Sequence, residues 1–148
     1  HDMHQLLRAY QTMLHEYGSM KEYIRQNATT GIEAIEALCR FFSQHGADKI
    51  IPKNTTSACK RVCMFLRWMV RTGSPVDLGL WADIIDRRTL IMPLDTHVVQ
   101  EAQRMNLLQS RTASMSTARR LTNTMLKIFP DDPLKGDFAL FGLGVDNK

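Results

Sequence analysis

Residues 52–71 read as a short loop followed by one amphipathic helix, and this stretch constrains the fold most. Thr55, Thr56 and Ser57 follow a Pro-Lys-Asn loop, and each can cap a helix. Apolar residues then recur at helical spacing: Ala58, Val62, Leu66 and Met69, joined by Cys59, Cys63, Phe65 and Val70. Gly73 is a natural residue to follow the last turn. The pattern predicts a long helix with one broad buried face.

The other face of this helix is basic. At about 100° per residue, Arg67 and Arg71 each fall within roughly 20° of Lys60 around the axis. No acidic residue occurs between Lys53 and Val76. Across the whole chain, residues 52–148 hold 14 Lys/Arg against 9 Asp/Glu, whereas residues 1–51 hold 5 against 6. A basic ridge of this kind indicates a polyanionic partner, although a solvated helix face explains it equally well.

Nearly all the remaining sequence also has helical periodicity. Ser19, Thr30 and Asp95 are expected to cap helices, and Leu90–Leu94 is expected to be extended because Met92 precedes a proline. Turns or short helices are expected at 76–81 and near Asp86, and longer helices at 2–17, 19–25, 31–44, 95–104, 114–129 and 134–141. With no strand pairs, the sequence predicts an all-α compact multi-helix domain over 1–148, with 1–51 as flanking helices.

Composition excludes several classes of protein. The 148 residues are 44% hydrophobic and 23% charged, which is globular, and no apolar run reaches the roughly 20 residues of a membrane span. Cys39, Cys59 and Cys63 lack zinc or iron–sulfur spacing, so we expect no metal, no cofactor, and free thiols in a reducing cytoplasm. Because the chain starts with His1 rather than Met, we expect it to be part of a longer protein. The oligomeric state cannot be read from the sequence.

Several segments resemble a known family. These are Cys59-Lys60-Arg61, 64–71, 76–81, Pro93-Leu94-Asp95-Thr96-His97 and 131–145. They look like the bacterial family filed as domain of unknown function 2400, which is distantly similar to the helix-hairpin-helix DNA glycosylase superfamily. The resemblance covers roughly residues 31–145. One departure is that the loop at 52–57 contains no glycine, whereas the superfamily hairpin is glycine-rich.

The resemblance implies a DNA repair protein with two catalytic residues. By position, Lys60 matches the lysine that attacks the sugar C1′ and forms a Schiff base in bifunctional glycosylases. Asp95 matches their catalytic aspartate, and Leu94-Asp95-Thr96-His97 looks like their Val-Asp-x-His signature. DNA is then the expected partner, and the residues expected to bind it are Lys53, Thr56, Ser57, Arg61, Arg67, Arg71 and His97.

The chemistry of these residues can also be argued directly. Lysine is a nucleophile only when unprotonated, and Lys60 lies in the first turns of a helix, where the positive end of the macrodipole disfavours an ammonium. An Asp95 carboxylate can stabilise positive charge on a departing nucleotide's sugar. The structural alternatives remain open: Asp95 as an N-cap only, Lys60 as a surface lysine, His97 as a packing residue, and Trp68 and Trp81 as core.

Three functions follow from these patterns. The first is a base-excision glycosylase with possible abasic-site lyase activity. The second is a non-catalytic nucleic-acid-binding module on the same scaffold, and the third is a helical protein-interaction adaptor.

Overall fold

The structure, a computed structural model, describes residues 1–109 and 112–136, and within these residues it is all-helical. Its helices are α1 (Asp2–Tyr17), α2 (Met20–Asn27), α3 (Gly31–Gln44), α4 (Lys60–Val70), the 3-10 helix η1 (Arg87–Thr89), α5 (Thr96–Arg104) and α6 (Met115–Ile128). The described residues form no strand, and their one β-type pairing is an isolated antiparallel bridge between Ser57 and Ser114. The expected all-α class is confirmed.

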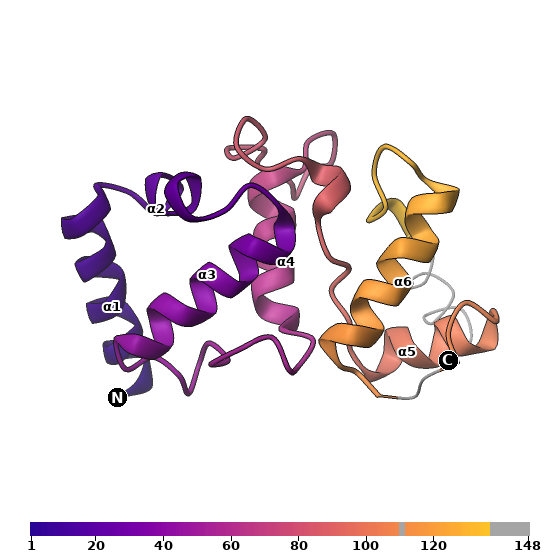
Figure 1. Cartoon of the computed structure of the whole chain (residues 1–148), viewed down its shortest axis with the longest axis horizontal. Coiled ribbons are helices and arrows are strands. Elements are labelled where there is room, and N and C mark those ends of the chain that lie inside the picture. The colour runs from indigo at the N-terminus through magenta and orange to yellow at the C-terminus, as the bar shows by residue number, and fades with distance from the viewer. Residues whose placement is uncertain (110–111, 137–148) are drawn as a thin grey trace.

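The helices are arranged as two groups on either side of α4. Helices α1, α2 and α3 pack on one another, and α3 also contacts α4 and η1. Figure 1 shows α1 to α3 at one end of the molecule, α4 near the middle, and α5 with α6 at the other end. The extended segment 90–94 crosses from the first group to the second, with all five residues buried. This crossing places the start of α5 near the start of α4.

Local capping chemistry fixes most helix starts where the sequence predicts them. Ser19 accepts from the amide of Glu22, and Ser114 accepts from that of Thr117. Thr30 and Glu33 form a reciprocal capping box. Gly18 ends α1 with φ 84°, a backbone conformation that glycine adopts readily. The predicted ends of α1, α3 and α6 are confirmed, and α2 extends two residues further than expected, to Asn27.

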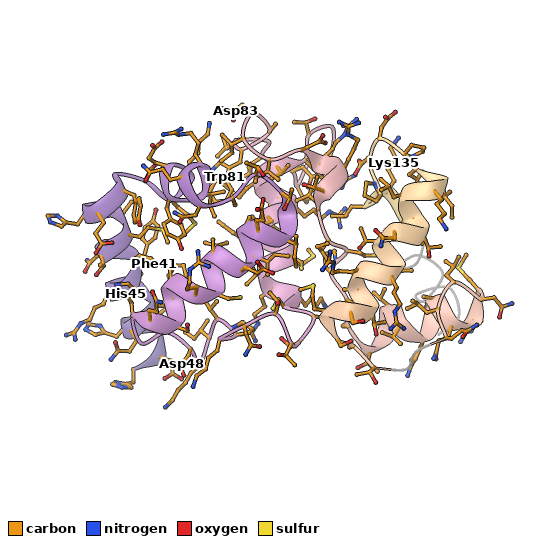
Figure 2. The ribbon with its side chains drawn as sticks, in the orientation of Figure 1. Phe41, His45, Asp48, Trp81, Asp83 and Lys135 are labelled. Carbon is orange, nitrogen blue, oxygen red and sulfur yellow. The ribbon has the colours of Figure 1, made fainter. Side chains whose placement is uncertain are left out.

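Aromatic side chains fill the core between the first three helices. Tyr23 lies between Tyr17 and Phe41, with ring centroids 4.9 and 5.1 Å away, and its hydroxyl donates to the carbonyl of Ala37. His45, the residue that follows α3, stacks on the Phe41 ring at 4.2 Å, and Figure 2 labels both side chains at that end of the helix. These contacts give the N-terminal group a continuous core.

The start of α4 differs from the expectation. The helix begins at Lys60, and Cys59 is its N-cap with a left-handed φ of 52° and no side-chain capping bond. The three hydroxyl residues lie upstream in a loop held by other contacts: the amide of Thr56 donates to Asn54 Oδ1, and its carbonyl accepts from Met115 N. The hydroxyl caps were therefore wrong. The helix expected at 134–141 falls largely outside the described residues.

Candidate functional site

Lys60 and Asp95 meet across 35 residues of sequence. The Nζ atom of Lys60 lies 2.6 Å from Oδ2 of Asp95. Lys60 is the first residue of α4, and Asp95 is the N-cap of α5, so two helix starts adjoin at this pair. The Lys60 side chain is 49% exposed and that of Asp95 is 36% exposed, so solutes can reach both. The structure therefore brings the two candidate catalytic residues into direct contact.

Asp95 divides its carboxylate between two tasks. Its Oδ1 atom accepts from the amide of Val98 at 2.9 Å and caps α5, while Oδ2 faces Lys60. Burial raises the pKa of Asp95, but the Lys60 ammonium and the Val98 amide outweigh it and hold that pKa below its usual 3.8. His97 adds a smaller effect in the same direction. Capping and the ion pair are thus simultaneous, and Asp95 carries a negative charge at neutral pH.

The segment that leads into Asp95 is rigidly held. Leu94 and Val98, on either side of the carboxylate, are 2% and 6% exposed. The Met92 amide donates to the Thr122 hydroxyl of α6 at 2.9 Å, and that hydroxyl donates onward to the Ala118 carbonyl. Burial of the flanks with exposure of the charged group is typical of a preorganised site.

A surface pocket of about 340 Å³ adjoins Lys60. Its lining includes Ser57, Cys59, Lys60, Arg61 and Leu94. Arg61 and Ser57 are exposed, as expected for contacts with a ligand. The pocket combines an ammonium, a guanidinium and a hydroxyl with an apolar wall, so it offers charge recognition and shape together.

The remaining expected binding residues are spread around this site. Thr56 is exposed beside Ser57, and His97 is half-buried in the first turn of α5. Lys53 is exposed, but its Nζ atom lies 3.5 Å from Asp48 Oδ2. The loop 52–59 therefore lies next to the Lys60–Asp95 pair, with part of its charge already balanced.

Arg67 and Arg71 do not form an exposed ridge, and that expectation is wrong. Arg67 is 4% exposed and Arg71 is 5% exposed. Arg71 donates to Asp132, with Nη2 2.7 Å from Oδ2, and its Nη1 lies 3.3 Å from Asp77 Oδ2. Arg67 Nε lies 4.0 Å from Asp77 Oδ1.

The physical reason is that the chain folds back over this face of α4. The amide of Leu78 donates to the carbonyl of Trp68, and that of Trp81 donates to Met69. These bonds bring Asp77 over the two guanidinium groups, and the turn at 131–134 supplies Asp132 from the other side. The sequence signal for this burial was the presence of acidic residues after the helix. These residues lie beyond the acid-free stretch, so helical periodicity alone does not connect them with the two arginines.

The two tryptophans separate into a core residue and a surface residue. Trp81 is 4% exposed and packs edge-on against Phe65 with centroids 5.5 Å apart, so its expected core role is confirmed. Trp68 is 41% exposed, and the same expectation was wrong for it. Exposed apolar residues lie in the segment that folds back on Trp68: Val76, Leu78 and Leu80.

A cluster of cysteines beside Lys60 was not foreseen. The neighbouring thiol of Cys39, on α3, lowers the pKa of Cys59 to about 6 against the effect of burial, with a smaller contribution from Ser57. Burial raises the pKa of Cys63 to about 12. All three cysteines are free and buried, as expected. Only the four-residue spacing of Cys59 and Cys63 was visible in the sequence.

No group of three or more His, Cys, Asp or Glu side chains within 1–109 and 112–136 is placed to hold a metal ion. In that part of the chain no helix combines the length and apolarity needed to cross a bilayer.

The chain matches one known protein family. No curated protein and no solved structure matches the chain. The profile of one family, described as "Protein of unknown function (DUF2400)", matches residues 1–146. Since the match spans almost the whole sequence, the chain belongs to the DUF2400 family.

Proposed function

We propose that this protein is a DNA-binding repair protein with helix-hairpin-helix glycosylase-like chemistry, acting at damaged or abasic nucleotides. The observation that carries the proposal is the Lys60–Asp95 pair, with 2.6 Å between amine and carboxylate and both groups reachable. We also propose that the protein is of bacterial origin and distantly related to those glycosylases. A cytoplasmic location is proposed because the three cysteines are free thiols.

The pair suits imine chemistry at a sugar. Lys60 supplies an amine nucleophile at the start of α4, and the Asp95 carboxylate that faces it can stabilise a cation. Binding of a sugar between the two groups breaks their direct contact and leaves the carboxylate beside the reacting carbon. Asp95 then lies where positive charge develops on the sugar, and its low pKa keeps it ionised there.

Attack of Lys60 on C1′ releases the base and leaves an imine on the sugar. Lys60 gives one proton to solvent, and its Nζ lone pair attacks C1′. The C1′–N bond to the base breaks, its electron pair leaves with the base, and the base takes up a proton. The sugar ring opens as the C1′–O4′ pair moves onto O4′, a proton passes from Nζ to O4′, and a protonated imine remains between Nζ and C1′. Loss of a C2′ proton then expels the 3′ phosphate, and water hydrolyses the imine.

The experiment that tests the proposal is borohydride trapping on a duplex with one abasic site. We expect a covalent protein–DNA adduct with the unmodified protein and none with Lys60→Gln. Lys21→Gln is the matched control, because Lys21 is a comparably exposed lysine, at 41%, that also forms an ion pair with an aspartate, Asp83. Equal trapping by Lys60→Gln and Lys21→Gln contradicts the proposal.

One observation favours a different function. Trp68, Val76, Leu78 and Leu80 are between 41% and 63% exposed, which is unusual for large apolar side chains close together. This apolar surface fits the helical protein-interaction adaptor. Under that function, the protein shows neither trapping nor salt-dependent binding to duplex, single-stranded or abasic DNA.

A further inference from the structure

A second acid-free part of the sequence lies against the candidate site. Residues 102–130 contain no Asp or Glu and five basic residues, Arg104, Arg111, Arg119, Arg120 and Lys127. Helix α6 (Met115–Ile128) lies inside this segment, so it carries basic side chains and no acidic one. Acid-free helices are uncommon among solvated surface helices, which usually mix both signs.

The two acid-free segments meet at one loop. Ser57 and Ser114 form the antiparallel bridge, and the amide of Met115 donates to the carbonyl of Thr56 at 3.4 Å. Figure 1 shows the loop before α4 reaching the start of α6. The loop that ends at Lys60 therefore also supports the first turn of α6.

This loop separates two pockets. Ser57 lines the pocket at Lys60, whereas Thr55 lines a second pocket of about 430 Å³ on α6. The second pocket is formed by Ile32, Glu36, Thr55, Met115, Ser116, Arg119, Arg120 and Asn123. Its guanidinium, hydroxyl and amide groups can donate to phosphate oxygens, and Glu36 is the single carboxylate in the lining.

Some exposed arginines of this protein pair with a carboxylate, whereas Arg119 and Arg120 do not within the described residues. Arg25, Arg88 and Arg104 each pair with a carboxylate of their own helix or turn. Across the described residues, neither Arg119 nor Arg120 forms an ion pair, and both are exposed. Their charge is thus available to a polyanion.

We propose that Arg119 and Arg120 bind the DNA phosphate backbone, on the other side of the 55–57 loop from Lys60. This inference rests on the proposed function, and it names the surface along which the strand leaves the site. The contacts are to phosphates, so they add affinity without sequence preference. Glu36 opposes them, and its removal strengthens binding.

The test measures binding of the full chain to a fluorescent duplex with a tetrahydrofuran abasic analogue, over about 50 to 300 mM KCl. Each phosphate contact contributes about −0.9 to the slope of log affinity against log salt. Arg119→Gln with Arg120→Gln should flatten the slope by about 2 and weaken binding about tenfold or more near 0.1 M salt. Glu36→Gln should tighten binding.

The control removes the same charge at the opposite end of the molecule, with Arg8→Gln and Arg25→Gln on α1 and α2. We expect its slope to equal that of the unmodified protein. An unchanged slope in the Arg119/Arg120 variant, or weaker binding by Glu36→Gln, overturns the inference, as does a complete lack of DNA binding. Salt-dependent binding through these arginines without borohydride trapping by the unmodified protein instead removes the proposed catalysis alone.

Discussion

Arg71 and Asp132 form an ion pair almost fully withdrawn from solvent, although 61 residues separate them. The Nη2–Oδ2 distance is 2.7 Å, and the side chains are 6% and 4% exposed. Arg71 Nε also donates to both carboxylate oxygens. The pair ties the end of α4 to the turn after α6, so it joins the two helix groups.

Asp132→Asn should therefore strongly destabilise the protein. Without the Asp132 carboxylate, the buried Arg71 guanidinium loses part of the negative charge that balances it. Such a loss typically costs about 3–5 kcal/mol of unfolding free energy. Urea denaturation followed by circular dichroism measures this. Asp83→Asn is the control, since it breaks a solvent-exposed pair with Lys21, which contributes much less to stability. Equal losses in the two variants contradict the structural role of the buried pair.

Asp95→Asn should change the pH dependence of stability. The pKa of Asp95 is lower in the folded chain than its usual 3.8, so its charged form contributes stability that is fully present above that value. The contribution disappears as pH falls through the lower folded pKa. Asn retains the cap on α5, so the stability difference should be largest near neutral pH and vanish in strong acid. Thermal melting from about pH 2 to pH 6 measures it, and a pH-independent difference rules out the ion pair as its source.

Cys59 should be the first cysteine to react with iodoacetamide. Hydrogen bonding from Cys39 lowers the pKa of Cys59 to about 6, whereas burial raises that of Cys63 to about 12. Cys59 also lines the pocket at Lys60. Peptide mass spectrometry across about pH 5 to 8 should show labelling of Cys59 that rises with a midpoint near pH 6. Faster labelling of Cys63 is incompatible with this cluster.

Gly31→Ala should destabilise the protein, although alanine is the better helix former. A Cβ atom at Gly31 overlaps the carbonyl oxygen of Thr89 and lies 2.9 Å from Cα of Leu90. Both are backbone atoms, so the helix start must move, at a cost of about 1–3 kcal/mol. Helix propensity alone predicts a gain of about 1 kcal/mol. The sign of the change in unfolding free energy decides between the two.

Features set by neighbouring residues could be read from the sequence. Thr30, Ser114 and Asp95 cap helices through amides three residues away, so the local pattern contains the whole interaction. The extended backbone of residues 90–94 followed from the proline after Met92. Such features account for most element boundaries.

Features set by distant segments could not be read from periodicity. Helical spacing put Arg67 and Arg71 on an outer face, but Asp132 arrives from 61 residues beyond Arg71. The approach of Cys39 to Cys59 depends in the same way on how α3 packs against α4. The Lys60–Asp95 pairing was anticipated only through a family resemblance, because no spacing rule brings residues 35 apart together.

The central claim is that Lys60 forms an imine at C1′ with Asp95 beside it. The most direct measurement is to locate the borohydride-reduced adduct by peptide mass spectrometry after trapping on abasic duplex DNA. We expect the reduced sugar on Nζ of Lys60, and about 100-fold or greater slowing of base release from a damaged duplex in Asp95→Asn. An adduct on another lysine, or none in a protein that binds the duplex, contradicts the account.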